Sequence, residues 1–224
     1  MKKILITGDV HADFGRLNAL INRKKPDIVI CCGDFGYWPR YQKYDFSNIM
    51  PQGAKIYWID GNHEDHWALR DRTTDEIVKD VIYKPRGSTM KLDDGRNILF
   101  MGGADSIDKM HRTEGVSWFR EEIIQQKDLY DLTDEKVDIF ITHTCPEELV
   151  NDLRKGYPEK SNEPSNIALS ELWKQYKPEL WIFGHWHQAK EGTMMGTKWY
   201  ALDYPTHGGR WWMWLPERGE NKVT

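Results

Sequence analysis

Short apolar runs recur along the chain, and polar residues of the metal-ligand type follow each of them. The runs are four or five residues long and rich in β-branched and aromatic side chains, which is typical of strands buried on both faces. A glycine or a threonine lies between each apolar run and its polar residues. We therefore predict buried strands at residues 4–7, 28–32, 56–60, 139–142 and 180–183.

Helical spacing occurs between some of these runs. Residues 14–21 carry apolar side chains at the spacing of an amphipathic helix, with Pro26 beyond its end. A second helix is predicted over residues 167–176, stopped near Pro178. Residues 93–95, Asp-Asp-Gly, have the composition of a hairpin turn between two strands.

The order of the elements indicates the fold class. Further strands are predicted in residues 198–203 and 208–216, so helices alternate with strands early and strands dominate later. This pattern favours an α/β sandwich with mixed sheets over a purely parallel doubly wound sheet, in one domain over residues 1–224. Ligands of such folds gather at the carboxyl ends of the strands, which is where the polar residues lie.

Composition and charge narrow the function classes. The net charge is −4, so the chain has no overall basic excess of the kind that holds proteins on duplex nucleic acid. Its three cysteines, Cys31, Cys32 and Cys145, argue against a disulfide framework because their number is odd and two are adjacent. No stretch approaches the roughly 20 apolar residues of a membrane span, and the first apolar run is too short for a signal peptide. We expect a soluble, cytoplasmic protein without a membrane partner.

The polar residues at the predicted strand ends suit divalent metals. They offer carboxylate, amide and imidazole groups without thiolate, which favours Mn²⁺, Fe or Zn²⁺ over a structural tetrahedral zinc. Asp9 and His11 are two residues apart, as are His185 and His187, so an extended backbone would turn each pair to one side. Two dications with Asp9, Asp34 and a bridging hydroxide carry a net charge of about +1, which attracts a phosphate.

Five short blocks resemble, in order, the signature of the calcineurin-like metallophosphoesterase superfamily: GDVH, GD, GNHE, TH and GHWH. They extend from residue 9 to residue 187, and the short chain is most similar to small bacterial or phage-type members. The resemblance implies a four-layer α/β sandwich, with two mixed sheets flanked by helices and a dimetal site at the strand ends. It also implies hydrolysis of phosphate esters by two divalent metal ions, Mn²⁺ first and Fe or Zn²⁺ as alternatives, with a bridging hydroxide.

The resemblance assigns roles to individual residues. One metal would be held by Asp9, His11 and His187, and the other by Asn62, His143 and His185. Asp34 would bridge the two metals, and Asn62 would also contact the substrate. His63 would protonate the leaving alcohol or orient the phosphate, a task that suits a side chain with a pKa near neutrality.

The expected substrate follows from a departure from the pattern. Protein phosphatases of the superfamily continue the second block as GDxxDRG, whereas residues 33–40 read GDFGYWPR. Their arginine after GNHE has no clear counterpart, with Arg70 and Arg72 nearest. This favours a phosphodiester substrate, a nucleotide or a nucleic-acid end. A phosphomonoesterase is the alternative, and a non-catalytic scaffold is a third function, disfavoured by the complete ligand set.

Two segments are candidates for substrate contact. Residues 37–44 mix aromatic with basic side chains, so they could stack a base and bring Arg40 to the substrate. The alternative is a surface loop that packs its own aromatic rings. Residues 102–112 also follow a predicted strand, and there the alternative is ordinary solvated charge. Their candidate phosphate ligands are Lys109, His111 and Arg112.

Overall fold

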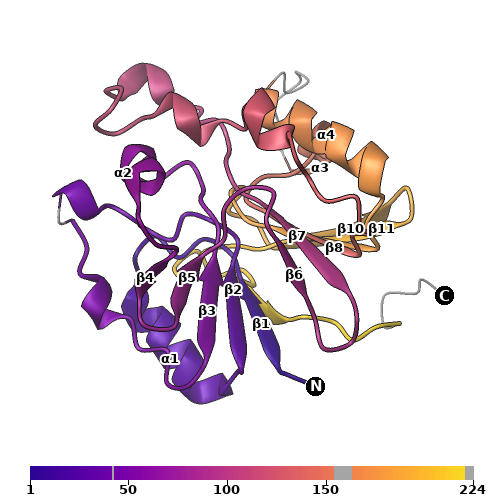
Figure 1. Ribbon diagram of the computed structural model, residues 1–224, viewed down its shortest axis with the longest axis horizontal. Helices are drawn as coiled ribbons and strands as arrows, with labels where there is room; N and C mark the ends of the chain where they lie inside the picture. The colour runs from indigo at the N-terminus through magenta and orange to yellow at the C-terminus, as the bar shows by residue number, and fades with distance from the viewer. Residues whose placement is uncertain (42, 154–162, 220–224) are drawn as a thin grey trace.

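The computed structural model describes residues 1–41, 43–153 and 163–219, in which the strands form two six-stranded sheets (Figure 1). The first sheet has the order β12 (Trp212–Trp214), β1 (Ile4–Thr7), β2 (Ile28–Cys31), β3 (Lys55–Trp58), β5 (Val81–Tyr83) and β4 (Glu76–Val78). The second has the order β10 (Lys190–Met194), β11 (Thr197–Ala201), β9 (Leu180–Phe183), β8 (Ile139–Thr142), β7 (Asn97–Met101) and β6 (Thr89–Lys91). In each sheet the inner strands are parallel and both edge strands are antiparallel to their neighbours.

Helices cover the outer face of each sheet (Figure 1). On the first sheet lies α1 (Phe14–Lys24), with α2 (His66–Asp71) after β3, and on the second lie α3 (Glu147–Leu153) and α4 (Pro164–Tyr176). Short 3₁₀ turns occupy the loops: η1 (Pro39–Tyr41), η2 (Phe46–Asn48), η3 (Lys109–His111), η4 (Arg120–Glu122) and η5 (Gln126–Leu129). None of the helices in the described ranges has the length and apolar character that a membrane crossing requires.

Alternation along the strands produces the layers. Successive strand residues point to opposite faces, so Ile4 and Ile6 pack between the sheets with Ile139, while Leu5 packs against α1. In the second sheet Phe140 turns outward instead, into the cluster beneath α3 and α4. Every inner strand is therefore covered on both faces, and the predicted four-layer sandwich with two mixed sheets is confirmed.

The predicted helices are also present. The first ends at Lys24 and is capped by Lys25, a left-handed residue (φ 52°) whose N–H bonds to the carbonyl oxygen of Ile21. The second is α4, which begins at Pro164, before the predicted span. Its face against the second sheet carries Ala168, Leu169, Leu172 and Trp173, whereas Ile167, the first residue of the predicted span, is 43% exposed.

The hairpin turn at residues 93–95 and the strands predicted in residues 198–203 and 208–216 are present, with some differences in length. Residues 93–95 connect β6 to β7, and Gly95 takes the positive φ (85°) that such a turn requires. The last strand is shorter than the apolar pattern of residues 208–216 suggested. It pairs antiparallel with β1, with Met213 opposite Ile6, so the chain returns to the first sheet after completing the second.

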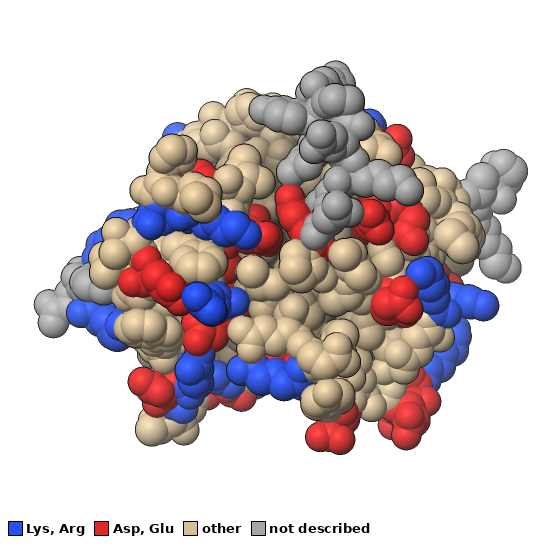
Figure 2. All heavy atoms as spheres, turned by 90° about the horizontal axis from the view of Figure 1, so that it is seen from above, with Lys and Arg blue, Asp and Glu red and all other residues tan. Residues whose placement is uncertain are grey.

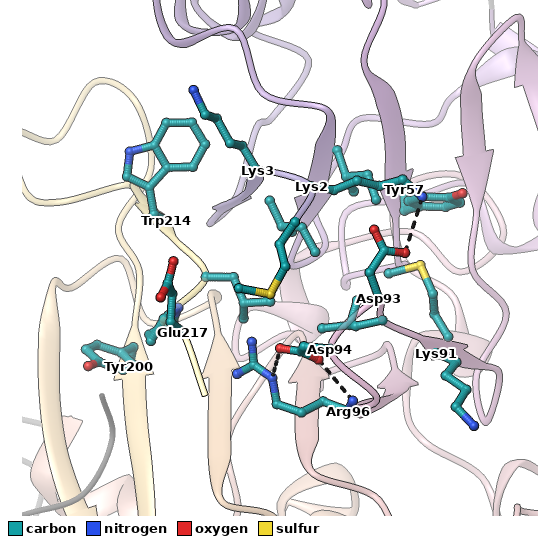
Figure 3. Close-up of a pocket in the computed structure, with 17 residues that line it drawn as sticks. Lys2, Lys3, Tyr57, Lys91, Asp93, Asp94, Arg96, Tyr200, Trp214 and Glu217 are labelled. Carbon is teal, nitrogen blue, oxygen red and sulfur yellow. Dashed lines mark hydrogen bonds and ion pairs between the residues drawn. The ribbon is translucent and has the colours of Figure 1, made fainter. Parts of the chain in front are cut away.

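Both ends of the sandwich carry charged side chains. Around the end where the parallel strands finish, basic and acidic side chains are interspersed (Figure 2). Near the opposite end, where Ile4 and Ile28 begin their strands, lies a cavity of about 800 Å³ (Figure 3). Its lining contains an ion pair of Lys2 with Asp93, at 3.6 Å. None of the predicted ligands lines this cavity, so it is separate from the predicted site.

Candidate metal centre

The predicted ligands all lie just beyond the carboxyl ends of inner strands, and both sheets contribute. The first sheet supplies Asp9 and His11 after β1, Asp34 after β2, and Asn62 and His63 after β3; the second supplies His143 after β8 and His185 and His187 after β9. The strand ends of the two packed sheets meet at one edge, so residues far apart in sequence become neighbours.

A first group of ligand atoms is formed by Asp9, His11 and His187. The Nε2 atom of His187 lies 3.2 Å from Nε2 of His11 and 3.1 Å from Oδ2 of Asp9. Nε2 of His11 is 3.8 Å from the same carboxylate oxygen. These three side chains can point their donor atoms at one cation.

A second group surrounds Asn62. Its Oδ1 atom lies 3.1 Å from Nε2 of His143 and 3.0 Å from Nδ1 of His185. Asp34 lies between the two groups: its Oδ1 is 3.4 Å from Nε2 of His143, and its Oδ2 is 3.8 Å from Nε2 of His11. The two oxygens of one carboxylate thus face both groups.

Hydrogen bonds orient the ligands of the second group. Nδ1 of His143 lies 2.8 Å from the carbonyl oxygen of Cys32, which can only accept, so this nitrogen carries a proton and Nε2 is the atom directed at the centre. The amide nitrogen of Asn62 donates to Oγ of Ser106 at 3.0 Å, which turns Oδ1 toward the histidines. Nε2 of His143 and Oδ1 of Asn62 therefore face the same space.

The electrostatics of the centre also fit cations. Asp9 and Asp34 are buried, and burial alone would raise the pKa of each carboxyl. Neighbouring histidines outweigh this effect: the charge of His143 holds the pKa of Asp34 well below its usual range, and a hydrogen bond from His187 helps to lower that of Asp9. Burial, with the charge of His143, lowers the pKa of His185 to about 3. Buried carboxylates facing a neutral imidazole form the donor set that divalent metals prefer.

The backbone at the centre departs from the expected extended form. His11, His185 and His187 have φ values of 47°, 65° and 49°, and Asp34 has 44°. These left-handed conformations cost side-chain-bearing residues of order 1–3 kcal/mol each and concentrate at functional sites. The extended backbone on which the one-sided projection of His185 and His187 depended is therefore absent, and the turns direct His185 to Asn62 and His187 to the first group.

Two glycines allow the loops to approach the ligands. A Cβ on Gly61 would lie 2.0 Å from Oδ1 of Asp34, and one on Gly184 would lie 2.0 Å from Oδ1 of Asp9. The space next to each carboxylate is thus available only because these positions have no side chain.

Sequence reasoning missed Glu64, the last residue of the GNHE block. Its buried carboxylate accepts hydrogen bonds from the backbone N–H groups of Gly36 (2.9 Å) and Gly61 (2.6 Å), which ties the loop after β2 to the loop after β3. Burial raises the pKa of this carboxyl well above its usual value. Glu64 belongs to the GNHE block that carried the family resemblance, but the sequence assigned it no role of its own.

Tyr204 was also missed, and no sequence pattern marked it. Its ring lies 4.5 Å from the ring of His187 and 5.9 Å from that of His11, measured between centroids. On its other side it stacks on His207, whose Nδ1 is 3.0 Å from a carboxylate oxygen of Asp203. Tyr204 therefore borders the first group of ligands.

The predicted substrate ligands are not all near the centre. Arg112 and Asn62 line a cavity of about 770 Å³ above the ligands, together with His63. Arg40 instead pairs with Asp65 and Lys109 with Asp105, while His111 is exposed on η3. The lining of this cavity includes none of these last three candidates.

The aromatic segment at residues 37–44 is largely packed, as the alternative interpretation expected. The ring of Tyr37 stacks on Phe46 and contacts Trp58, and Trp38 is 8% exposed. Nε1 of Trp38 donates to the carbonyl oxygen of His63 at 2.7 Å. Residue 42 lies outside the described residues.

Comparison with known proteins places the chain in a family. The family of calcineurin-like phosphoesterases matches residues 2–189, and no curated protein matches the chain. Similar solved structures include TT1561 of Thermus thermophilus, 15% identical, with a TM-score of 0.55 and coverage of 91% of this chain and 89% of that one. Phosphopantetheinyl hydrolase (PptH) from Mycobacterium tuberculosis is 13% identical, with a TM-score of 0.55 and coverage of 100% and 99%. The chain thus belongs to the calcineurin-like phosphoesterases, hydrolases of phosphate esters.

Proposed function

We propose that this protein is a phosphodiesterase that uses two divalent metal ions, Mn²⁺ first among them, on a nucleotide or a nucleic-acid end. The observation that carries the proposal is the convergence of the two ligand groups on Asp34, which presents one oxygen to each. Asp9, His11 and His187 would hold one ion, and Asn62, His143 and His185 the other. When bound, such a pair supplies an activated water and neutralises charge on the phosphoryl group.

His63 is the proposed proton donor to the leaving alcohol. Its backbone N–H bonds to Oδ1 of Asp34 at 2.8 Å, which holds the residue beside both ligand groups. Burial and the charge of Arg112 lower the pKa of His63, against the opposing effect of Asp34. An anionic substrate would raise this pKa again, so protonation of His63 is coupled to binding of the phosphate.

A diester is favoured by the positions of the arginines. Arg70 pairs with Glu121 and Arg72 with Asp75, and neither lines the cavity above the ligands. Among the described residues of its lining, the cation is Arg112, which stands beside His63. This single arginine of the described lining offers fewer contacts for the dianionic group of a monoester than the protein phosphatase pattern supplies.

The test compares a nitrophenyl phosphodiester with the matching monoester in the presence of Mn²⁺, with a chelated control. We expect chelator-sensitive cleavage of the diester, with a higher kcat/KM than for the monoester. His63→Ala should lose most of this activity while it retains its metal content, measured by elemental analysis. Preferential cleavage of the monoester would instead identify a phosphomonoesterase, and an inactive protein without bound metal would indicate a scaffold.

A further inference from the structure

Two cavities meet at His63 and Arg112. The larger, of about 770 Å³, is lined by part of the ligand set (Asp34, Asn62, His185 and His187) and by the apolar groups of Ile107, Leu153 and Trp186. The smaller, of about 310 Å³, is lined by Trp38, Lys43, His63, Arg112, Val116 and Ser117. The two residues shared by these linings are the proposed proton donor and its arginine neighbour. The smaller cavity therefore adjoins the place where an ester bond would break.

The boundary between the cavities is held in place. Two guanidinium nitrogens of Arg112 lie 3.4 Å from the two ring nitrogens of His63, so the guanidinium lies directly against the imidazole. Nε of Arg112 is 2.8 Å from Oδ1 of Asp108, and its Nη1 donates to the carbonyl oxygen of Ser117 at 3.3 Å. These contacts fix the boundary without closing either cavity.

The smaller cavity has a positive and aromatic lining. Lys43 and Arg112 contribute cations, and the lining contains no carboxylate. The ammonium of Lys43 lies 5.3 Å from the ring centroid of Trp38 and 5.2 Å from that of Tyr44, which holds it at the edge of the cavity. Within the described ranges no carboxylate pairs with Lys43, so its charge is available to a ligand.

We propose that the smaller cavity binds the second arm of a phosphodiester, and that this arm carries a phosphate of its own. The proposal rests on the phosphodiesterase function above. A monoester has one organic arm, which the larger cavity accommodates, whereas a diester has two. Hydrolysis adds water across one P–O bond: the phosphorus gains the oxygen of water, and the departing arm leaves as an alcohol with the proton. The second phosphate takes no part in this step and contacts Lys43.

The experiment uses three dinucleotides: ApA, pApA with a 5′ phosphate, and ApAp with a 3′ phosphate. Cleavage of the internal linkage is measured with Mn²⁺ in the wild type, Lys43→Ala, Lys43→Arg and Lys24→Ala. Lys24 is the matched control because its ammonium also lies over an aromatic ring, at 4.6 Å from the centroid of Trp212, but on α1. Removal of its charge tests for a general effect of net charge.

We expect the wild type to cleave one of the two phosphorylated dinucleotides with a kcat/KM about tenfold above that of ApA, the size of one charge-assisted contact. Lys43→Ala should reduce this advantage to about twofold or less, while Lys43→Arg and Lys24→Ala keep it. Equal rates for the three dinucleotides, or an advantage that survives Lys43→Ala, would overturn the proposal. Cleavage of a nitrophenyl diester but of no dinucleotide would overturn it too and leave the phosphodiesterase function standing. Cleavage of monoesters alone would overturn both.

Discussion

Asp34 is the residue at which the two ligand groups meet. Its two oxygens face His11 and His143, its backbone is left-handed, and the backbone N–H of His63 bonds to its carboxylate. A carboxylate with a pKa held below its usual range stays ionised at all neutral pH values. We therefore expect the negative charge of Asp34, and not only its position between the two ligand groups, to be required for metal binding.

Replacement of Asp34 by Asn tests this charge with little change of volume. We expect Asp34→Asn to lower kcat/KM for the phosphodiester by about 100-fold or more, as for the loss of one electrostatic group at a reacting centre. The measurement is Mn²⁺-dependent cleavage, with Asp27→Asn, a change at an exposed residue, as the control. Unchanged activity and an unchanged Mn²⁺ dependence would contradict the assignment.

Glu122 supports the second ligand group from a distance. Its Oε1 accepts from the backbone N–H of Ser106 at 2.6 Å and from Nε1 of Trp118 at 2.9 Å, and Ser106 in turn receives the amide of Asn62. Oε2 of Glu122 is buried, with no hydrogen-bond partner among the residues that the structure describes. Burial raises the pKa of this carboxyl to about 7.

The pKa of Glu122 predicts a pH dependence of stability. The folded protein holds this proton up to about pH 7, whereas the unfolded chain loses it near 4.5, so the free energy of unfolding falls between these values as pH rises. Glu122→Gln lacks the titration, and its Tm relative to the wild type should increase from pH 5 to pH 8. For Glu121→Gln the difference should stay flat, because the bond to Arg70 lowers the pKa of Glu121. If the Tm difference between Glu122→Gln and the wild type did not change with pH, the raised pKa of Glu122 would be refuted.

At the residue scale, sequence reasoning reached the side chains that follow the strands and missed those that support them. Asp34 and His143 each come directly after an apolar run, so their position relative to the sheet could be predicted. Glu122 and Tyr204 reach the centre through loops, and nothing in their local sequence marks a buried or aromatic contact. Arg40 is the opposite case: its segment suggested a substrate contact, but its guanidinium pairs with Asp65.

At the scale of elements, the apolar runs predicted the strands but not the turns that follow them. Burial on both faces gives a strand a recognisable composition. The left-handed turns at His11, His185 and His187 involve side-chain-bearing residues, which carry no such signature. These turns set the orientation of the three histidines. The sequence therefore predicted where the ligands lie along the chain, but not the backbone conformation that orients them.

Gly184→Ala tests the fit of one such turn. The added methyl would overlap Oδ1 of Asp9, and overpacking of this kind costs about 1–3 kcal/mol, so we expect a lower Tm and weaker Mn²⁺ binding. Gly15→Ala is the matched control, because its Cβ would make only ordinary contact, at 3.7 Å, and it lies within α1. There Ala should raise stability by up to about 1 kcal/mol. Equal metal affinity in both variants, measured by calorimetry, would argue against the close approach.

At the scale of the whole molecule, the centre joins two sheets that are otherwise held by apolar packing. Asp9, Asp34 and Asn62 come from the first sheet, and His143 and His187 from the second. The pairing within each sheet could be expected from short connections between neighbouring strands. The return of β12 to β1 could not, because it depends on a contact between the two extremes of the described chain.

Metal binding should therefore stabilise the whole fold. Each site filled at 100 times its Kd adds about 2.7 kcal/mol to the free energy of unfolding, which in a protein of this size raises Tm by roughly 5–10 °C. The measurement is a thermal melt with Mn²⁺ against a chelated sample, repeated with His187→Ala, for which a smaller rise is expected. A Tm that is insensitive to Mn²⁺ would mean that the ligands do not bind it in the folded state.

The pairing of β12 with β1 has a consequence for the order in which the protein is made. Synthesis proceeds from the N-terminus, so β1 leaves the ribosome long before Trp212–Trp214 exists to cover its free edge. During this interval the nascent chain presents an unpaired apolar strand, Ile4–Thr7, together with strand-end ligands whose histidine partners at residues 185 and 187 are still untranslated. Chaperone capture should therefore persist until β12 emerges, and the newborn chain would acquire its full set of metal ligands only after residue 187 has been translated.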